Sequence, residues 1–301
     1  MTRQTNTAEW TVVRMLEWAT GYFEERGVDQ PRLSIEWLLA HVLAVPRLHL
    51  YLQFDRPLAE TELADLRELV RRRARHEPLQ YITGTCSFYG RAFHVGQGVL
   101  IPRPETEELV ELCLKAAEPA SSERPLRVLD LGTGSGCIAI TLALELPGAE
   151  VHAVDVSEQA LEIAESNAKQ LGAKVAFRQG DMRRMDRLDA QGPWDVIASN
   201  PPYVLPSESD SLDPQVRDHE PHLALFHPQP LELIAPMLAY AAHTLRPSGR
   251  LVVELNPRLA DQALETARMH LPHSRLESDL AGAPRFLVGE ATTANSGTRS
   301  S

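Results

Sequence analysis

The spacing of apolar residues changes character along the chain. In the first part they recur every three or four positions, as on one face of a helix, which predicts helices over residues 12–26, 35–45 and 63–75. Gly27 and Pro46 are suitable stops for the first two of these helices. Short amphipathic helices bury their apolar faces against one another, so residues 1–76 are expected to form a small helical bundle.

The pattern becomes irregular between residues 77 and 100. Short apolar and aromatic groups, at residues 81–82, 88–89 and 93–95, are separated by glycines, which predicts a β-hairpin linker. A helix is then expected to begin near Pro104, because proline suits a first helical turn and the glutamates that follow complement its positive end.

From residue 101 to 290, short apolar runs alternate with amphipathic segments. Strands are expected at residues 127–131, 151–154, 175–177, 196–199, 251–254 and 286–288, and helices at 138–146, 158–171, 233–245 and 260–271. This alternation is typical of an α/β fold with a mostly parallel sheet that helices cover on both faces. Residues 291–301 are polar and are expected to be a disordered tail.

Charge and cysteine content narrow the class of protein. The chain has 301 residues and a formal net charge of −11, which argues against binding along a phosphate backbone. Four arginines at residues 71–73 and 75 are interpreted as a solvated helix end, because no aromatic residues interleave with them. The three cysteines have neither disulfide nor metal-site spacing, and no apolar run is long enough to span a membrane. We expect a soluble cytoplasmic protein without a metal site.

A glycine-rich turn follows the first predicted strand of the α/β part. The run DLGTGSG at residues 130–136 lets the backbone approach a ligand at the carboxyl edge of the sheet. A nicotinamide-binding G-x-G-x-x-G motif would need glycine at position 137, which is Cys137. Asp155 ends the next strand and could accept hydrogen bonds from ribose hydroxyls. Asp181 and Met182 follow the third strand, where they could contact an adenine ring.

The run NPPY at residues 200–203 follows a buried strand. Its prolines lack N–H groups and stiffen the turn, so that its carbonyls are free to accept hydrogen bonds, and Asn200 adds a side-chain acceptor. This arrangement suits the gripping of a planar NH2 group, although an ordinary strand-ending turn would use the same residue types. Tyr203 would either pack against the amide plane or make a core contact, and Arg103 would either shape the substrate cleft or belong to a helix start.

The glycine turn and the NPPY run together resemble methyltransferases that act on planar NH2 nitrogens. Three further stretches, EPLQYITG at 77–84, VLIPRPETE at 99–107 and RDHEP at 217–221, resemble the peptide chain release factor glutamine methyltransferases, the HemK family. The resemblance implies a class I S-adenosylmethionine-dependent methyltransferase fold, which is Rossmann-like with a mostly parallel seven-stranded sheet. It also implies methyl transfer from S-adenosylmethionine to the glutamine side-chain nitrogen in the Gly-Gly-Gln loop of class I release factors.

These expectations assign a role to each candidate residue. The catalytic candidates are Asn200, Pro201 and Tyr203; the cofactor-binding candidates are Gly132, Thr133, Gly134, Ser135, Gly136, Asp155, Asp181, Met182 and Asn200; the substrate-binding candidates are Asn200, Pro201, Pro202, Tyr203 and Arg103. The helical residues 1–76 would dock the release factor, and the protein would act as a monomer without nucleic acid or a membrane.

Two other functions use part of the same evidence. An adenine-N6 nucleic acid methyltransferase would need a basic groove, which a net charge of −11 does not favour. A non-catalytic cofactor-binding scaffold would not need to keep both Asn200 and Asp155. The chain also departs from the family pattern at residues 224–230 and at Asn256, where glycines are usual, and Asn256 could adopt left-handed backbone angles in their place.

Overall fold

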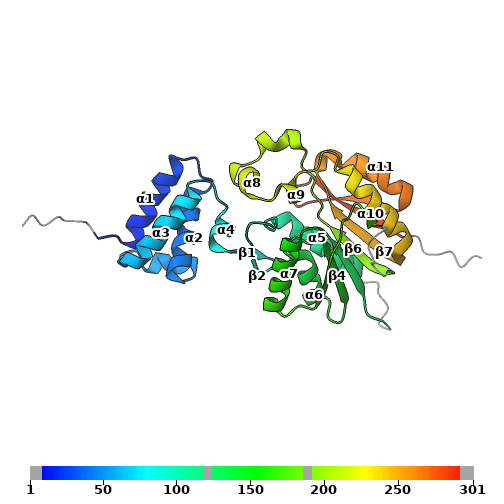
Figure 1. Cartoon of the computed structure of the whole chain (residues 1–301), viewed down its shortest axis with the longest axis horizontal. Coiled ribbons are helices and arrows are strands. Elements are labelled where there is room, and N and C mark those ends of the chain that lie inside the picture. The colour runs from blue at the N-terminus through cyan, green and yellow to red at the C-terminus, as the bar shows by residue number, and fades with distance from the viewer. Residues whose placement is uncertain (1–8, 118–123, 186–191, 292–301) are drawn as a thin grey trace, which may run out of the picture. The chain divides into compact units, whose positions relative to one another are not determined.

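The computed structural model describes residues 9–117, 124–185 and 192–291, and contacts divide it into two units (Figure 1). One unit holds the chain up to Gly84 together with Asp213–His219, and the other holds Thr85–Leu212 and the chain from Glu220 onward. The predicted tail at residues 292–301 lies outside the described residues.

The first unit is helical, as the apolar spacing predicts. Its elements are α1 (Val12–Glu24), α2 (Pro31–Leu43), η1 (Arg47–Leu52), α3 (Glu60–Arg73), α4 (Leu79–Thr83) and α8 (Pro214–His219). The helices enclose an apolar core that includes Leu16, Phe23, Leu38 and Leu66, each at most 1% exposed. Burial of these side chains supplies most of the stability of such a bundle, at about 25 cal/mol per Å² of apolar surface.

Two details of this unit differ from the sequence-based expectations. Residues 81 and 82 belong to the helix α4 instead of a hairpin strand, because Ile82 packs into the helical core and Gly84 ends the helix in a left-handed conformation. Arg73 is only 4% exposed, so its part of the arginine run is not a solvated helix end. Its guanidinium donates to Ser34 Oγ, to the Asp29 and Glu77 carbonyls and to Gln215 Oε1. These acceptors replace the water that a charged group needs.

The second unit is a seven-stranded sheet in the order β5-β4-β3-β6-β7-β9-β8. The strands are β3 (Arg127–Leu131), β4 (Glu150–Asp155), β5 (Val175–Gln179), β6 (Trp194–Ser199), β7 (Leu245–Glu254), β8 (Arg275–Ser278) and β9 (Pro284–Glu290). The first five run parallel, whereas β9 is antiparallel to β7 and to β8. The predicted α/β fold with a mostly parallel seven-stranded sheet is therefore confirmed. The separate hairpin consists of β1 (Thr85–Phe88) and β2 (Arg91–His94).

Helices cover both faces of the sheet. One apolar core lies under α5 (Pro104–Ala117), α6 (Cys137–Glu145) and α7 (Glu158–Leu171), and the other under α10 (Leu231–Thr244) and α11 (Ala260–His270). Strand residues alternate between the cores, with Val128 in the first and Leu129 and Leu131 in the second. The remaining short helices are η3 (Pro206–Ser211), α9 (His222–Leu225) and η4 (Pro257–Leu259).

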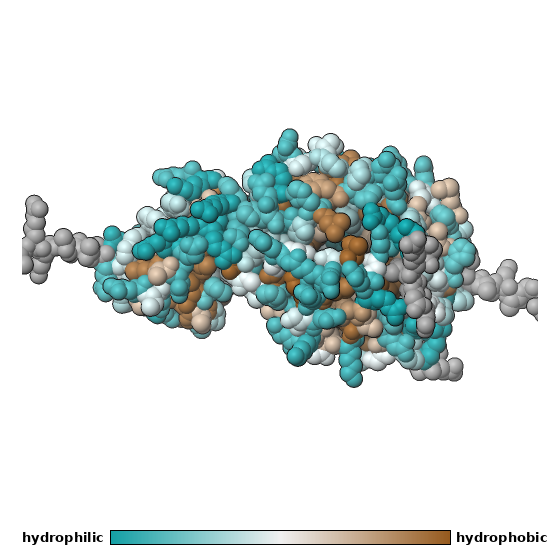
Figure 2. Space-filling view, in the orientation of Figure 1, coloured by the Kyte–Doolittle hydropathy of each residue, from teal (hydrophilic) through white to brown (hydrophobic). Residues whose placement is uncertain are grey.

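The strand order places a crevice at the carboxyl ends of the central strands. Strand β4 lies on one side of β3 and β6 on the other, so the connections after β3 and β6 diverge there. The face shown in Figure 2 is mostly hydrophilic on both units, with small separated apolar areas. Across the part of the chain that the structure describes, no helix is both long and apolar enough to cross a bilayer.

Candidate functional site

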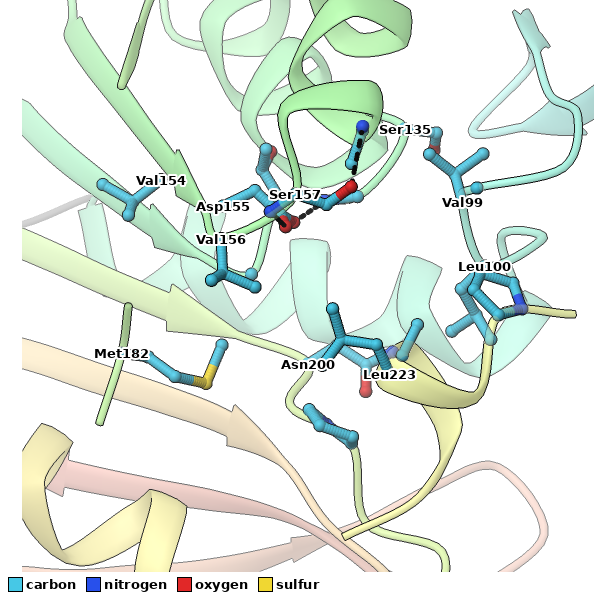
Figure 3. Close-up of a pocket in the computed structure, with 18 of the residues that line it drawn as sticks. Val99, Leu100, Ser135, Val154, Asp155, Val156, Ser157, Met182, Asn200 and Leu223 are labelled. Carbon is cyan, nitrogen blue, oxygen red and sulfur yellow. Dashed lines mark hydrogen bonds between the residues drawn. The ribbon is translucent and has the colours of Figure 1, made fainter. Parts of the chain in front are cut away.

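A pocket lies at this edge of the sheet, entirely within the second unit (Figure 3). Ten of the predicted site residues line it: Arg103, Gly132, Thr133, Gly134, Ser135, Asp155, Asp181, Met182, Asn200 and Pro202. Gly136, Pro201 and Tyr203 are not among its lining residues. The carboxyl ends of β3, β4 and β6 thus bring together side chains that are far apart in the sequence.

The glycine turn after β3 has a backbone that only glycine adopts easily. Gly132, Gly134 and Gly136 have φ values of +75°, +55° and +81°. A Cβ atom on Gly132 would lie 2.6 Å from Cε of Met182, and one on Gly136 would lie 2.7 Å from Cδ1 of Ile140. The Gly132 and Thr133 N–H groups donate to the Val154 carbonyl at 2.8 and 3.0 Å, which fixes the turn against β4.

Asp155 lies at the end of β4, beside this turn. Its carboxylate accepts hydrogen bonds from the Gly134 N–H at 2.8 Å and from the Ser157 N–H at 2.9 Å. Burial raises the pKa of Asp155, while these N–H groups favour the charged form and limit the rise. A carboxylate has about four lone-pair positions, so Asp155 retains capacity to accept from a ligand hydroxyl.

Asp181 and Met182 form another part of the wall, after β5. The carboxylate of Asp181 is held by the side chain of Arg183 at 2.7 to 3.0 Å, and this hydrogen bonding lowers the pKa of Asp181. Arg183 also lines the pocket, and the only signal for it in the sequence is its position two residues after Asp181. Met182 contributes an apolar surface beside Gly132.

Asn200 follows β6 and lies across the pocket from Asp155 (Figure 3). Its Nδ2 donates to Oγ1 of Thr106, in the first turn of α5, at 3.2 Å. Thr106 donates in turn to Oε2 of Glu254 at 2.8 Å. Sequence reasoning assigned neither Thr106 nor Glu254 to the site, because a hydrogen-bonded pair 148 residues apart has no local signal.

Tyr203 points to the same carboxylate. Its Oη donates to Oε1 of Glu254 at 3.1 Å, and burial with the nearby charge of Glu254 raises the pKa of Tyr203. Glu254 is 1% exposed, and burial raises its pKa, against hydrogen bonds from Thr106 and Tyr203 and the charge of Arg285. The hydroxyl of the half-buried Tyr203 thus contacts a buried carboxylate, and packing of its ring against an amide plane stays a prediction.

Arg103 lines the pocket on a segment that one carboxylate holds in place. Glu220, 3% exposed, accepts from the Arg103 guanidinium and, at 3.0 Å, from the Ile101 N–H. The ion pair with Glu220 therefore holds the Arg103 guanidinium beside the pocket. Glu220 is also the first residue of the segment 220–227.

That segment forms an apolar rim of the pocket. Leu223 is 62% exposed and lies there with Phe226, Val99 and Leu100. The Val204 N–H donates to the Leu225 carbonyl and the His227 N–H to the Val204 carbonyl, each at 3.0 Å, so the rim is tied to the residue after the NPPY run. The segment 224–230, which lacks the usual glycines, thus forms a short parallel β-bridge between Phe226 and Val204.

The second departure from the family pattern is accommodated differently. Asn256 has φ of −67° and so does not use the left-handed conformation that is open to asparagine; its Oδ1 caps η4 by accepting from the Arg258 N–H. Across the described residues, no cluster of three histidine, cysteine or acidic side chains is placed to hold a metal ion.

Comparison with known proteins identifies both parts of the chain. Residues 14–84 match the PrmC N-terminal domain family, and residues 122–274 match a methyltransferase domain family. The release factor glutamine methyltransferase of Chlorobaculum tepidum is 44% identical over 86% of this chain and 89% of its own. That of Rhodopirellula baltica is 40% identical over 95% of this chain and 98% of its own. A human methyltransferase 10 domain containing protein is 17% identical, with a TM-score of 0.49 over 69% of this chain and 90% of its own. The chain belongs to the family of release factor glutamine methyltransferases.

Proposed function

We propose that this protein transfers a methyl group from S-adenosylmethionine to the side-chain amide nitrogen of the glutamine in the Gly-Gly-Gln loop of class I release factors. The observation that carries the proposal is that Asn200 and Asp155 line one pocket. An amide-binding side chain thereby shares a cavity with a carboxylate placed for a ribose. Membership of the family supplies the substrate class.

The chain's own residues fit this cofactor. The glycine turn offers a backbone surface that a Cβ atom at Gly132 would obstruct. Asp155 sits at the end of the strand next to that turn, in the position from which acidic residues bind ribose hydroxyls. Met182 supplies an apolar contact for a planar ring, and we propose Asp181, which Arg183 holds, as the acceptor for an adenine amino group.

S-adenosylmethionine, when bound, supplies an electrophilic methyl group. The glutamine amide nitrogen is a weak nucleophile because its lone pair is delocalised into the carbonyl. We propose that the oxygen of Asn200 and the carbonyl of Pro201 accept its two N–H groups and thereby aim the lone pair at the methyl carbon. Rate enhancement then comes from orientation and fixed dipoles, and the extra proton leaves to water after transfer.

The remaining expectations belong to the same proposal. Residues 1–76 would dock the release factor, residues 77–100 would link the domains, and residues 101–290 would hold the chemistry. The protein would work in the cytoplasm as a monomer. A net charge of −11 supports a protein substrate over a nucleic acid one.

The test offers methyl-labelled S-adenosylmethionine with three acceptors: a class I release factor, its Gly-Gly-Gln variant with alanine in place of glutamine, and double-stranded DNA. We expect label on the unmodified release factor alone. Label on the DNA would instead indicate an adenine methyltransferase, and equal labelling of both release factors would place the methyl group elsewhere.

A further inference from the structure

A buried chain of hydrogen bonds lies at the wall of the pocket, where Thr106 and Asn200 are lining residues, and it ends on Asn200. It runs from Nδ2 of Asn200 to Oγ1 of Thr106 at 3.2 Å and from Thr106 to Oε2 of Glu254 at 2.8 Å. Tyr203 donates to the other Glu254 oxygen at 3.1 Å. Thr106 is 2% exposed and Glu254 is 1% exposed, so water does not compete for these bonds.

With Glu254 ionised, the donors and acceptors of this chain have only one consistent direction. An ionised carboxylate accepts hydrogen bonds and donates none, so the single proton of the Thr106 hydroxyl goes to Glu254. The hydroxyl oxygen of Thr106 then has only lone pairs to offer Asn200. Of the two ends of the Asn200 carboxamide, only the NH2 group can donate to it. Glu254 therefore decides which end of Asn200 faces Thr106.

Both ends of the chain are attached to rigid elements. Thr106 lies in the first turn of the 14-residue helix α5, and Glu254 is the last residue of β7, next to β6 in the sheet. Asn200 itself follows the last residue of β6. The orientation is thus set by a helix and two neighbouring strands, and does not depend on a mobile loop.

We propose that Thr106 and Glu254 are positioning residues that hold the carboxamide oxygen of Asn200 toward the pocket. This proposal rests on the proposed methylation of an amide nitrogen. A reversed carboxamide would present NH2 to the substrate NH2 group, two donors facing each other. The reaction needs an acceptor at that point. Thr106 lines the pocket and Glu254 does not, and the role assigned to both residues is to act through Asn200.

The test compares three variants of the full chain: Thr106→Val, Thr106→Ser and Thr141→Val. Valine has nearly the shape of threonine but lacks the hydroxyl, and serine restores it. Thr141 is the matched control because it is 0% exposed and its hydroxyl has no hydrogen-bond partner among the described residues. Cofactor affinity, measured by calorimetry, is expected to stay within about twofold in all three.

With a release factor as substrate, Thr106→Val is expected to lower kcat by roughly tenfold to a hundredfold, more than it changes KM. Thr106→Ser and Thr141→Val are expected to keep kcat within about threefold of the original value. Equal kcat for Thr106→Val and Thr141→Val would overturn the proposal. Failure of Thr106→Ser to restore kcat would do so as well.

A measurement without substrate separates this proposal from the proposed function. The side-chain NH2 resonance of Asn200, assigned with an Asn200→Asp variant in ¹⁵N-labelled protein, reports exchange with water. We expect slow exchange in the original protein and in Thr106→Ser, and faster exchange in Thr106→Val. Identical exchange rates in the original protein, Thr106→Ser and Thr106→Val would overturn the proposal that Thr106 orients the Asn200 carboxamide, whatever the substrate proves to be. Absence of transfer to any release factor by the original protein would overturn only the proposed function.

Discussion

The carboxamide of Asn200 donates through its nitrogen to Thr106, which leaves its oxygen for a partner in the pocket. Asp155 faces the same pocket but is bonded to the backbone of the glycine turn. Under the proposed function the first residue acts on the amide and the second on the cofactor. Substitutions at the two sites should therefore affect different steps.

Asn200→Ala is expected to lower kcat by about a hundredfold to a thousandfold, the usual cost of losing one fixed dipole at a reacting centre. Cofactor affinity should change little.

Asp155→Asn is expected to show the opposite pattern, with about a tenfold or greater loss of cofactor affinity, because hydrogen bonds to a charged group contribute about 1.5–3 kcal/mol. Calorimetry and single-turnover rates measure the two effects. Loss of cofactor binding in Asn200→Ala would contradict the role assigned to Asn200.

Asp130 is expected to make the stability of the protein depend on pH. It is 0% exposed, and burial raises its pKa from the ordinary 3.8 to about 7. The folded state then binds more protons than the unfolded state between those two values, so the free energy of unfolding falls as pH rises through that range. The change is about 1.4 kcal/mol for each pH unit over which only the folded state holds the proton.

The measurement is urea unfolding of the ligand-free protein and of Asp130→Asn between about pH 4 and 8. We expect the original protein to lose stability relative to the variant as pH rises, since asparagine does not titrate. The other carboxylates are shared by the two proteins, and those that do not interact with Asp130 cancel in the difference. Parallel pH profiles would show that Asp130 is not the source of the effect.

At the scale of elements, the sheet could largely be predicted from the sequence. The strands β3, β4, β6 and β7 each contain a short, mostly apolar stretch that is buried on both faces, such as residues 251–253 of β7. Strand β8 was missed because it is an edge strand, in which Leu276 is the only apolar residue among charged and polar neighbours. The short helices α4 and α8 lack enough residues to show a helical period.

The site, like the sheet, has residues that could be predicted from the sequence and residues that could not. Its glycines and terminal strand residues are local patterns, and ten of the predicted residues line the pocket. Thr106 and Glu254 could not be found in this way, because their pairing arises from the packing of α5 against β6 and β7. The apolar rim residue Leu223 likewise gives no local signal of a pocket.

A glycine of the turn, Gly136, can be compared with Gly148 outside it to separate the cost of backbone strain from the cost of steric overlap. Gly136 and Gly148 have similar φ values of +81° and +85°, but only Gly136 has neighbours that an added Cβ would meet. Gly148→Ala should cost about 1–2 kcal/mol of unfolding free energy from strain alone. Gly136→Ala should cost more, because the new Cβ would also lie 3.1 Å from Cβ of Ala164.

Urea unfolding measures both costs, and calorimetry measures cofactor affinity. Only Gly136→Ala is expected to weaken cofactor binding, because it alone lies in the turn beside the pocket. Equal stability of the two variants would contradict the role given to packing at this turn.

At the scale of the whole molecule, the chain crosses between its units more than once. Residues 213–219 are continuous with the second unit on both sides, yet they fold with the helical bundle. Gln215 accepts from Arg73 at 2.9 Å, and His219 contacts the Arg75 carbonyl at 3.1 Å. Residues 213–219 are therefore held within the first unit by contacts with α3 and with Arg75 just after it.

Arg73→Lys is expected to destabilise the first unit by about 1–3 kcal/mol, because one ammonium cannot reach the four acceptors that the planar guanidinium serves. Amide hydrogen exchange of residues 213–219 should accelerate in this variant. Arg71→Lys is the matched control, since Arg71 is exposed on the same helix. The same exchange rates in both variants would mean that Arg73 does not hold this segment.

The central claim is that the Asn200 carboxamide positions one glutamine amide for methyl transfer. Its most direct test is fragment-ion mass spectrometry of a class I release factor after reaction with this protein and S-adenosylmethionine. We predict one added methyl group on the side-chain nitrogen of the Gly-Gly-Gln glutamine, and none when Asn200→Ala replaces the original protein. A methyl group on any other residue, or an undiminished yield with Asn200→Ala, would contradict it.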